Sequence, residues 1–346
     1  MSFFVRQAAV RAARRTAVPF VHLYRMESTW QPALKSGALP VYDEALAFLE
    51  EDAKQLRERI ASEKANSNAS DKEQQQRVDA LEIVSKINLP ATRWAFQQGQ
   101  YSMTKPVFRH LREQSWRLGG SLDRLEERLQ CMHVLPDVVP SVQPTVDLEV
   151  LFGTGNGIGD HGGEGGSILP GVFLDPARTL EPPSIRATVF HPDERKYTLM
   201  LVDPDVPCEE TQSFQTYVHW LVKDVPLSLE KNAIPEGHAA LLPYIPPHPQ
   251  RGTPYHRYTM LLFEQTAEST VAEIPREAMD VSAFASAHQL KLAGIHFWRE
   301  QWTDKTKHTI STIYKDVLKA SEPRYGHPGR MDRLKDELGM RQSKYY

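Results

Sequence analysis

Three apolar stretches decide the fold: residues 197–207 read YTLMLVDPDVP, residues 216–222 read TYVHWLV, and residues 258–263 read YTMLLF. Each is short, rich in Val, Leu, Tyr and Thr, and bounded by Pro, Gly or charged residues. Runs of this length and composition are typical of strands in an antiparallel sandwich or barrel. Two similar runs precede them, at 146–152 and 185–190. The sequence therefore predicts a β-rich domain from about residue 134 to residue 302.

Two parts of this region differ from the predicted strands in composition or in the spacing of their apolar residues. A glycine-rich insert, residues 153–167, contains the spacing Gly157, Gly159, Gly162 of a dinucleotide fingerprint. That motif needs a helix directly after it, and the following GGEGGSILPG cannot open one. We interpret the insert as a flexible surface loop. Between residues 281 and 304 the large apolar residues recur at helical intervals, so a helix is expected there: Phe284, Leu290, Ile295, Trp298 and Trp302.

Residues 41–130 have the pattern of amphipathic helices. In the first, apolar residues recur in alternating steps of four and three: Tyr42, Leu46, Leu49, Ala53, Leu56 and Ile60. Further helices are predicted from near Asp71 to Pro90, from about Pro106 to Leu118, and from Ser121 onward. Each helix offers a single apolar stripe. The stripes must therefore pack either on the following domain or on an external partner, and the sequence leaves both readings open.

The formal net charge of −3 is unevenly distributed. Residues 1–26 and residues 291–346 each carry a net charge of +5, which leaves −13 for the middle of the chain. Two basic ends on an acidic body indicate a partner met at the ends. The two cysteines, Cys131 and Cys208, are too few for a disulfide framework, and free thiols are expected. No apolar run approaches the roughly 18 residues of a membrane span, so the chain is not expected to be membrane-embedded.

The first 26 residues are predicted to be a mitochondrial transit peptide. They contain five arginines and many alanines, and they lack Asp and Glu. On a helical wheel most of the arginines lie on one half and most of the alanines on the other, which is typical of such presequences. A disordered basic arm is the alternative interpretation. A matrix location agrees with free cysteines.

Acidic and histidine side chains gather at the ends of the predicted strands. Asp203 and Asp205 are two apart, so in an extended chain both point to the same side. His219 lies in the next strand, and His256 opens a further one after a turn that contains Gly252. A catalytic centre would need a nucleophile beside a base, and no obvious Ser or Cys stands there. A metal site, a small anion site and a buried polar network remain open.

The order of these motifs resembles the phosphatidylethanolamine-binding protein family. The shared features are DPDVP, then HW, then a proline-rich Gly-Thr turn that leads to HRY and LLF. LPDVVP, ILPGVFLDPARTLEPPS and FASAHQLKLAGIHFWREQW match the family around them. The resemblance covers about half the chain. It implies an antiparallel β fold with a shallow pocket for phosphate-like groups, lined by Asp203, Asp205, His219, Gly252 and His256, with Tyr258 beside it.

The turn departs from the family pattern at three positions. Pro246 stands in place of the first glycine, Gln250 in place of a proline, and Pro254 in place of the glycine after Thr253. Proline fixes φ and lacks an N–H, whereas glycine can adopt positive φ and donate. We therefore expect an altered, vestigial pocket. No cofactor, metal or small-molecule substrate is predicted, and the protein is not expected to be an enzyme.

The additions to the β domain resemble those of the family member that belongs to the large subunit of the mitochondrial ribosome. The predicted division is a transit peptide (1–26), a helical extension (27–130), the β domain (131–304) and a basic tail (305–346). This resemblance implies a structural role near the central protuberance, with large-subunit proteins and rRNA as partners. A free mitochondrial headgroup binder or inhibitor-like regulator is the alternative. The candidate contact residues are Arg109, Arg112, Arg117, Arg324, Arg330 and Arg333, whose charges a solvated helix face would explain equally well.

Overall fold

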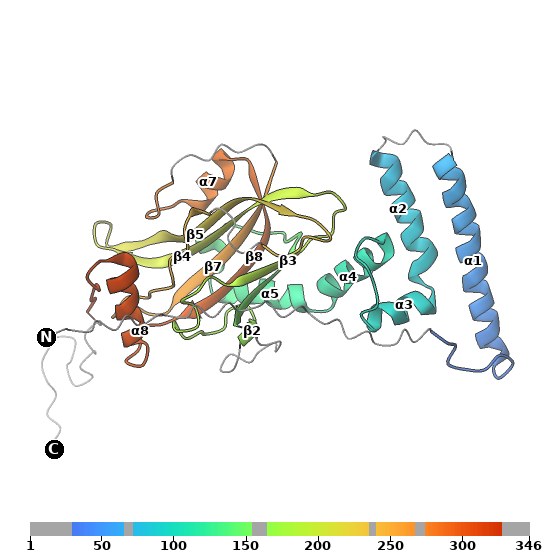
Figure 1. The fold of residues 1–346 in the computed structure, drawn as a ribbon, viewed down its shortest axis with the longest axis horizontal. Coiled ribbons are helices and arrows are strands. Elements are labelled where there is room, and N and C mark those ends of the chain that lie inside the picture. The colour runs from blue at the N-terminus through green and yellow to red at the C-terminus, as the bar shows by residue number, and fades with distance from the viewer. Residues whose placement is uncertain (1–29, 66–71, 154–164, 235–239, 267–273, 327–346) are drawn as a thin grey trace, which may run out of the picture.

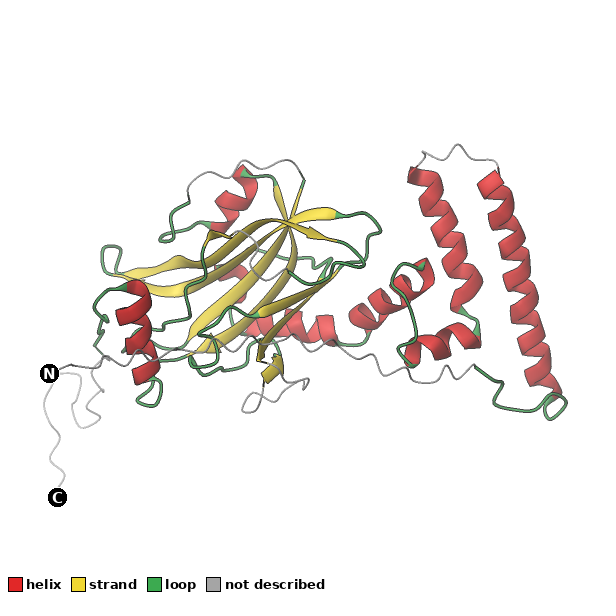
Figure 2. Cartoon of the chain, viewed as in Figure 1, coloured by secondary structure: helices red, strands yellow, loops and turns green. Residues whose placement is uncertain are grey.

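The chain folds into an antiparallel β body preceded by a series of helices (Figure 1). The computed structural model describes residues 30–65, 72–153, 165–234, 240–266 and 274–326. Figure 2 shows the strands gathered in one part of the molecule and the two longest helices standing apart from them. The predicted fold class, a β domain with an N-terminal helical extension and a C-terminal helix, is confirmed.

The limits of the N-terminal helices follow signals in the sequence. Pro90 and Pro106 occupy the first turn of their helices, where a missing N–H costs no hydrogen bond. Gly119 and Gly120 separate two successive helices. The elements are α1 (Pro40–Ala65), α2 (Lys72–Ile87), α3 (Pro90–Gln97), α4 (Pro106–Leu118), α5 (Ser121–Cys131) and the short α6 (Val134–Asp137).

The strands form two antiparallel sheets. The smaller has the order β2-β1-β3, with β1 (Asp147–Gly153), β2 (Gly165–Ser167) and β3 (Ser184–Thr188). The larger has the order β6-β5-β4-β7-β8, and consists of β4 (Arg195–Cys208), β5 (Ser213–Leu227), β6 (Ala240–Leu242), β7 (His256–Gln265) and β8 (Leu290–Glu300). Helices α7 (Val281–Ala287) and α8 (Lys307–Thr312), followed by the π-helical turn η1 (Ile313–Leu318), complete the body. The fingerprint glycines of the insert lie outside the described residues.

The larger sheet is buried on both faces. Along β4, Leu199 and Leu201 enter the core between the two sheets, while Met200 and Val202 enter a second core beneath α5 and α7. This alternation follows the two-residue period of a strand. Because both faces are covered, the strand is apolar at nearly every position rather than at every other one. The uninterrupted run in the sequence is therefore explained.

The helical extension divides into two parts with different packing. Leu122, Leu125 and Leu129 of α5 belong to the second core of the sheet, and Trp116 of α4 stacks on Phe190 with ring centroids 5.5 Å apart. Helices α2, α3 and α4 share a smaller cluster around Val107, Phe108 and Leu111. The predicted boundaries at residues 26, 130 and 304 stay predictions, and α5 shares its core with strands on the other side of residue 130.

Helix α1 contributes little to any core. Only Ala53 and Ile60 are buried along its 26 residues, where it packs antiparallel to α2. Figure 1 shows this hairpin projecting from the molecule, with α1 as its outer helix. None of the helices in the described part of the chain is long and apolar enough to cross a membrane.

The helix expected between residues 281 and 304 is mostly a strand. Only α7 is helical, and β8 then pairs with β7 along its whole length. The turn between them places Gln289 at φ +52°, so Phe284 and Leu290 belong to different elements. The apolar spacing was misleading because β8 is buried on both faces, where apolar residues no longer follow the two-residue period.

Candidate functional site

Four of the predicted pocket residues come together at one end of the large sheet. Asp203 lies toward the end of β4, His219 lies in β5, and His256 and Tyr258 lie at the start of β7. The pairing of β4 with both neighbours brings these positions side by side. All four side chains are buried, with at most 2% of any residue exposed.

A chain of hydrogen bonds runs from Asp203 through His256 to Thr253. The Nδ1 of His256 lies 2.7 Å from Oδ2 of Asp203, and its Nε2 lies 2.9 Å from Oγ1 of Thr253. The Thr253 hydroxyl also donates to the carbonyl of Gln250 at 2.7 Å. Burial raises the pKa of Asp203, but the adjacent His256 outweighs this and the net pKa is lowered. An ionised Asp203 therefore faces Nδ1 of His256.

Asp203, His256 and Thr253 stand in the order of an acid–base–hydroxyl catalytic triad. The direction of the hydrogen bond at the hydroxyl differs from that of a triad. A nucleophilic hydroxyl must donate to the unprotonated nitrogen of the base. Here the Thr253 hydroxyl donates to the Gln250 carbonyl instead. The cluster therefore holds the turn at residues 250–253 against β4.

His219 presents an unprotonated nitrogen to the same cluster. Its Nδ1 donates to the carbonyl of Ile245 at 2.9 Å, so Nε2 carries a lone pair. Burial lowers the pKa of His219 to about 3, and it is neutral at physiological pH. His248 lies against it, with ring centroids 5.0 Å apart, and burial lowers its pKa as well. His248 was not among the predicted site residues, although it stands in the proline-rich turn.

Two buried polar atoms of the cluster have no hydrogen-bond partner among the described residues: Nε2 of His219 and the hydroxyl of Tyr258. The Tyr258 ring lies between His256 and Trp298 in stacked geometry, and meets His219 edge-on at 5.2 Å. A buried polar group without a partner is destabilising by about 1–3 kcal/mol. One acceptor and one donor are therefore available to a small polar ligand or to water.

Asp205 does not join this cluster. The pairing of β4 with β5 is irregular between Asp203 and Val206, so the simple alternation expected for the two aspartates does not hold. Both carboxylate oxygens of Asp205 instead accept from the guanidinium of Arg257, at 2.6 and 2.9 Å.

Arg257, which was not among the predicted site residues, joins the helical extension to the β body. Its Nη1 donates to the carboxylate of Asp137 at 2.8 Å and to the carbonyls of Met132 and His133. The other edge of its planar fork binds Asp205, so the guanidinium spans from β4 to the end of α5. Strand alternation was the available signal, because His256 and Tyr258 face one side and Arg257 the other.

Gly252 lies beneath the C-terminal segment of the chain. Its φ of +91° favours glycine, and an added Cβ would lie 2.0 Å from the carbonyl oxygen of Tyr325. The N–H of Tyr325 donates to the carbonyl of Arg251 at 2.8 Å. Tyr314 of η1 packs edge-on against His248, with centroids 5.3 Å apart. This covering of the turn by residues 307–326 was not predicted.

The substituted positions of the turn have separate surroundings. The carbonyl of Pro246 accepts from Nδ1 of His248 at 2.8 Å, and Gln250 is buried in the turn. Pro254 is exposed and lines a surface hollow of about 310 Å³ beside Asp205 and Arg257, away from the histidines. Glycine conformation is retained at Gly252.

The arginines proposed for RNA or protein contact on α4 are engaged within the chain. Arg109 pairs with Asp79 of α2 at 2.9 Å, and Arg112 pairs with Asp147 of β1 at 2.7 Å. Arg117 pairs with Glu113 at 2.9 Å. Arg324 is described and forms a backbone bridge with Arg251, whereas Arg330 and Arg333 lie outside the described residues.

The described part of the chain contains neither a cluster of metal ligands nor a disulfide between its two cysteines. No group of three His, Cys, Asp or Glu residues there is arranged to hold a metal ion. Cys131 and Cys208 are free, as expected.

The comparisons with known proteins agree with this geometry. Residues 156–298 match the family model described as phosphatidylethanolamine-binding protein. The chain is 31% identical to large ribosomal subunit protein mL38 of Schizosaccharomyces pombe over 251 residues, which cover 69% of this chain and 78% of that protein. It is 30% identical to protein BROTHER of FT and TFL 1 of Arabidopsis thaliana, over 51% of this chain and 92% of that one.

Solved structures of the family also align with the body. A phosphatidylethanolamine-binding protein from Plasmodium vivax aligns at 25% identity with a TM-score of 0.38, over 51% of this chain and 97% of that one. The matched strands, the DPDVP and HRY motifs and the Asp203–His256 pair occupy the region of the family model. The chain therefore belongs to the phosphatidylethanolamine-binding protein family and is a relative of large ribosomal subunit protein mL38.

Proposed function

We propose that this protein is a structural component of the large subunit of the mitochondrial ribosome, located in the region of the central protuberance and supporting mitochondrial translation. The extent of the similarity to mL38 carries the proposal. The alignment spans 251 residues, whereas the family model spans the 143 residues from 156 to 298. The aligned 69% of this chain is about 239 residues, so at least about 95 of them lie outside the family domain. The similarity includes the additions as well as the shared β body.

The proposal places the protein in the mitochondrial matrix. The arginine-bearing, acid-free segment 1–26 supports this as a transit peptide, and it lies outside the described residues. The partners are large-subunit proteins and rRNA. We assign protein contacts to the helical extension, because its arginines on α4 are already paired, and rRNA contacts to the basic tail after residue 326.

No catalytic step is assigned to the histidine cluster. Asp203 and His256 hold a turn through Thr253, and the Thr253 hydroxyl donates to the Gln250 carbonyl. On this proposal the β body is a rigid block that presents the extensions.

The decisive experiment is sedimentation of mitochondrial extracts through a gradient at high salt. We expect the protein to migrate with the large subunit, and recovery only in the soluble fractions would refute the proposal. Deleting residues 327–346 is expected to weaken retention more than Tyr258→Phe does. The deletion starts after residue 326 because residues 307–326 pack over the Gly252 turn.

A free phosphate-headgroup binder is the second candidate, and the unpaired His219 nitrogen and Tyr258 hydroxyl favour it. Calorimetric titration with inorganic phosphate and with phosphoethanolamine tests it. Tyr258→Phe is the informative variant, because it removes the free donor and keeps the ring stacking. The candidate requires binding that this variant weakens; absence of binding, or binding unchanged by the substitution, contradicts it.

A further inference from the structure

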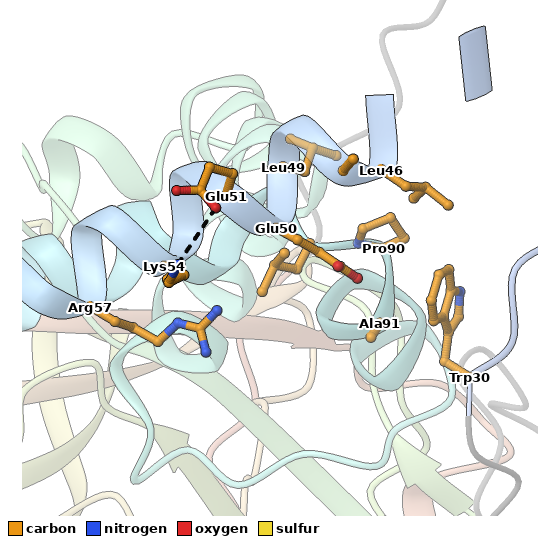
Figure 3. A pocket seen from close by; sticks show the side chains of 11 residues that line it. Trp30, Leu46, Leu49, Glu50, Glu51, Lys54, Arg57, Pro90 and Ala91 are labelled. Atoms are coloured by element: carbon orange, nitrogen blue, oxygen red, sulfur yellow. Dashed lines mark ion pairs between the residues drawn. The ribbon is translucent and has the colours of Figure 1, made fainter. Parts of the chain in front are cut away.

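A groove of about 540 Å³ runs between α1 and the start of α3, far from the histidine cluster. Figure 3 shows α1 along one side, with Pro90, Ala91 and Trp30 opposite. Its apolar lining residues are Trp30, Leu46, Ala47, Leu49, Leu89, Pro90 and Ala91. An apolar hollow of this kind, on a hairpin that buries little of its own surface, is typical of a binding groove.

The charged residues of the groove are arranged by sign along α1. Glu50 and Glu51 lie toward the N-terminal end, and Lys54 and Arg57 follow one to two turns later. Glu51 and Lys54 are 3.9 Å apart, and each is more than half exposed, so their mutual pairing is weak. The acidic end is reinforced by its surroundings, because residues 40–52 contain five Asp or Glu and neither Lys nor Arg.

The order of charges along the groove indicates which kind of molecule binds there. An RNA backbone would place phosphates against Glu50 and Glu51, which repel them. An ordinary amphipathic helix carries acidic residues in its first turn and basic residues in its last. Laid antiparallel to α1, its basic end meets Glu50 and Glu51, and its acidic end meets Lys54 and Arg57. Its apolar face then enters the groove, as in other helix-in-groove complexes.

We take the occupant to be another protein rather than the segment before Trp30. Removal of the predicted transit peptide would leave only residues 27–29 ahead of Trp30, which is fewer than a stable helix requires.

We propose that the α1–α3 groove binds an amphipathic helix of a neighbouring protein, oriented antiparallel to α1, with basic residues at its C-terminal end and acidic residues at its N-terminal end. This inference rests on the proposed function, because it names the class of partner that the extension meets in the large subunit. The apolar lining supplies affinity and the four charges supply orientation.

A photo-crosslinker tests the identity of the occupant. p-Benzoylphenylalanine replaces Glu50 at the groove rim or, as a control, Leu118 on the exposed side of α4, and purified mitochondrial large subunits are irradiated. We expect the Glu50 position to link to a helical peptide of another protein with the stated charge order, and the Leu118 position not to link to that peptide. Links to rRNA or to this chain, a partner segment of another kind, or the absence of a link would overturn the inference.

Matched substitutions test the contribution of each feature. Glu50→Lys with Glu51→Lys reverses the acidic rim, and Asp52→Lys with Glu58→Lys makes the same charge change on α1 outside the groove. Ala47→Trp fills the groove, and Ala45→Trp adds the same bulk at an exposed position that does not line it. Each variant competes with wild type for incorporation into large subunits. We expect each groove variant to be roughly threefold to tenfold less incorporated than its control.

The outcomes separate this inference from the proposed function. If wild-type protein sediments with the large subunit while groove variants and their controls are incorporated equally, the groove is not a docking site and the ribosomal role stands. If wild-type protein is absent from the large subunit, the ribosomal role fails, and the groove proposal fails with it.

Discussion

The β body and the α1–α2 hairpin use apolar and charged residues in opposite ways. In the body, β4 and β7 bury side chains on both faces, and its cation Arg257 is enclosed by carboxylates and carbonyls. On α1, Phe48 is 71% exposed and a groove of about 540 Å³ remains open. These strands of the body are covered on both faces, whereas the hairpin leaves an open apolar groove that a partner would cover.

The seam between the β body and the helical extension runs through α4 and α5. Helix α5 packs in the second core of the large sheet, and Arg257 fixes its C-terminal end. The paired arginines of α4 extend the attachment to α2 and β1. The open groove of the extension lies on the α1 hairpin.

The largest expected effect is at the seam itself. Arg257→Ala leaves Asp205 and Asp137 without their cation and frees two carbonyls, so the free energy of unfolding should fall by about 3–5 kcal/mol. Urea denaturation measures this loss. Arg124→Ala, which removes an exposed arginine bonded only to its own helix, is expected to change stability by less than about 0.5 kcal/mol. A loss below about 1 kcal/mol for Arg257→Ala would show that the seam does not depend on it.

Leu129→Ala tests whether α5 shares the core of the body. The side chain is fully buried in the second core, and its truncation should destabilise the protein by about 2–5 kcal/mol. The transition should remain single in circular dichroism and tryptophan fluorescence, because α5 unfolds with the sheet. Leu118→Ala on the exposed face of α4 is the control. Two separate transitions would instead make the extension an independent unit.

The pH dependence of stability should distinguish buried from exposed carboxyls. Burial raises the pKa of Glu300 to about 8, and its Oε1 accepts from Trp298. Between pH 4.5 and pH 8 the unfolded chain ionises this group while the folded protein keeps the proton, so its contribution to stability falls as pH rises. Glu300→Gln should therefore stabilise the protein by about 2–4 kcal/mol at pH 7.5 and have no such effect at pH 4.

Thermal denaturation at the two pH values measures the effect, and Glu58→Gln on the exposed face of α1 serves as the control. The change in stability caused by Glu58→Gln should be the same at the two pH values. An equal effect of both substitutions, or a larger gain for Glu300→Gln at pH 4, would contradict the assignment.

Substitution of two glycines with a similar positive φ distinguishes the energetic cost of backbone strain from the cost of a steric clash. Gly252 has φ +91° and lies against Tyr325, whereas Gly37 has φ +86° and open space around the position of a Cβ. Gly37→Ala should cost about 1 kcal/mol, and Gly252→Ala about 2–3 kcal/mol because the C-terminal segment must also move. Chemical denaturation measures both. Equal losses would mean that residues 307–326 contribute nothing to the stability of the turn.

The strand-length runs and the motif order were sufficient to predict the β body and to gather Asp203, His219, His256 and Tyr258. Motif order succeeds here because these residues stand on β4, β5 and β7, and the pairing of these strands brings them side by side. Asp205 was misplaced because a local irregularity in β4 breaks the two-residue period.

Other features depended on contacts between distant parts of the chain. The Arg257 fork joins residues more than 100 positions apart, and the Tyr325 contact with Gly252 depends on the path of the C-terminal segment. Strand alternation indicates the side on which Arg257 lies, but no pattern in the sequence identifies the distant partner in either contact. The arginines of α4 are a further case. The sequence shows that they are charged, but it does not show which carboxylates they contact.

The smallest expected change in the free energy of unfolding is that of a substitution on the exposed face of α1. Phe48 is 71% exposed on the hairpin, so Phe48→Ser should change the free energy of unfolding of the isolated chain by less than about 0.5 kcal/mol. An aromatic side chain that contributes nothing to its own fold, on a helix with an open groove, is available to a partner. Urea denaturation of the isolated protein checks the first statement, and a loss above about 1 kcal/mol would mean that the hairpin packs more tightly in solution. The body and the hairpin would then differ in degree rather than in kind, since Phe48 would serve the fold as Leu129 does.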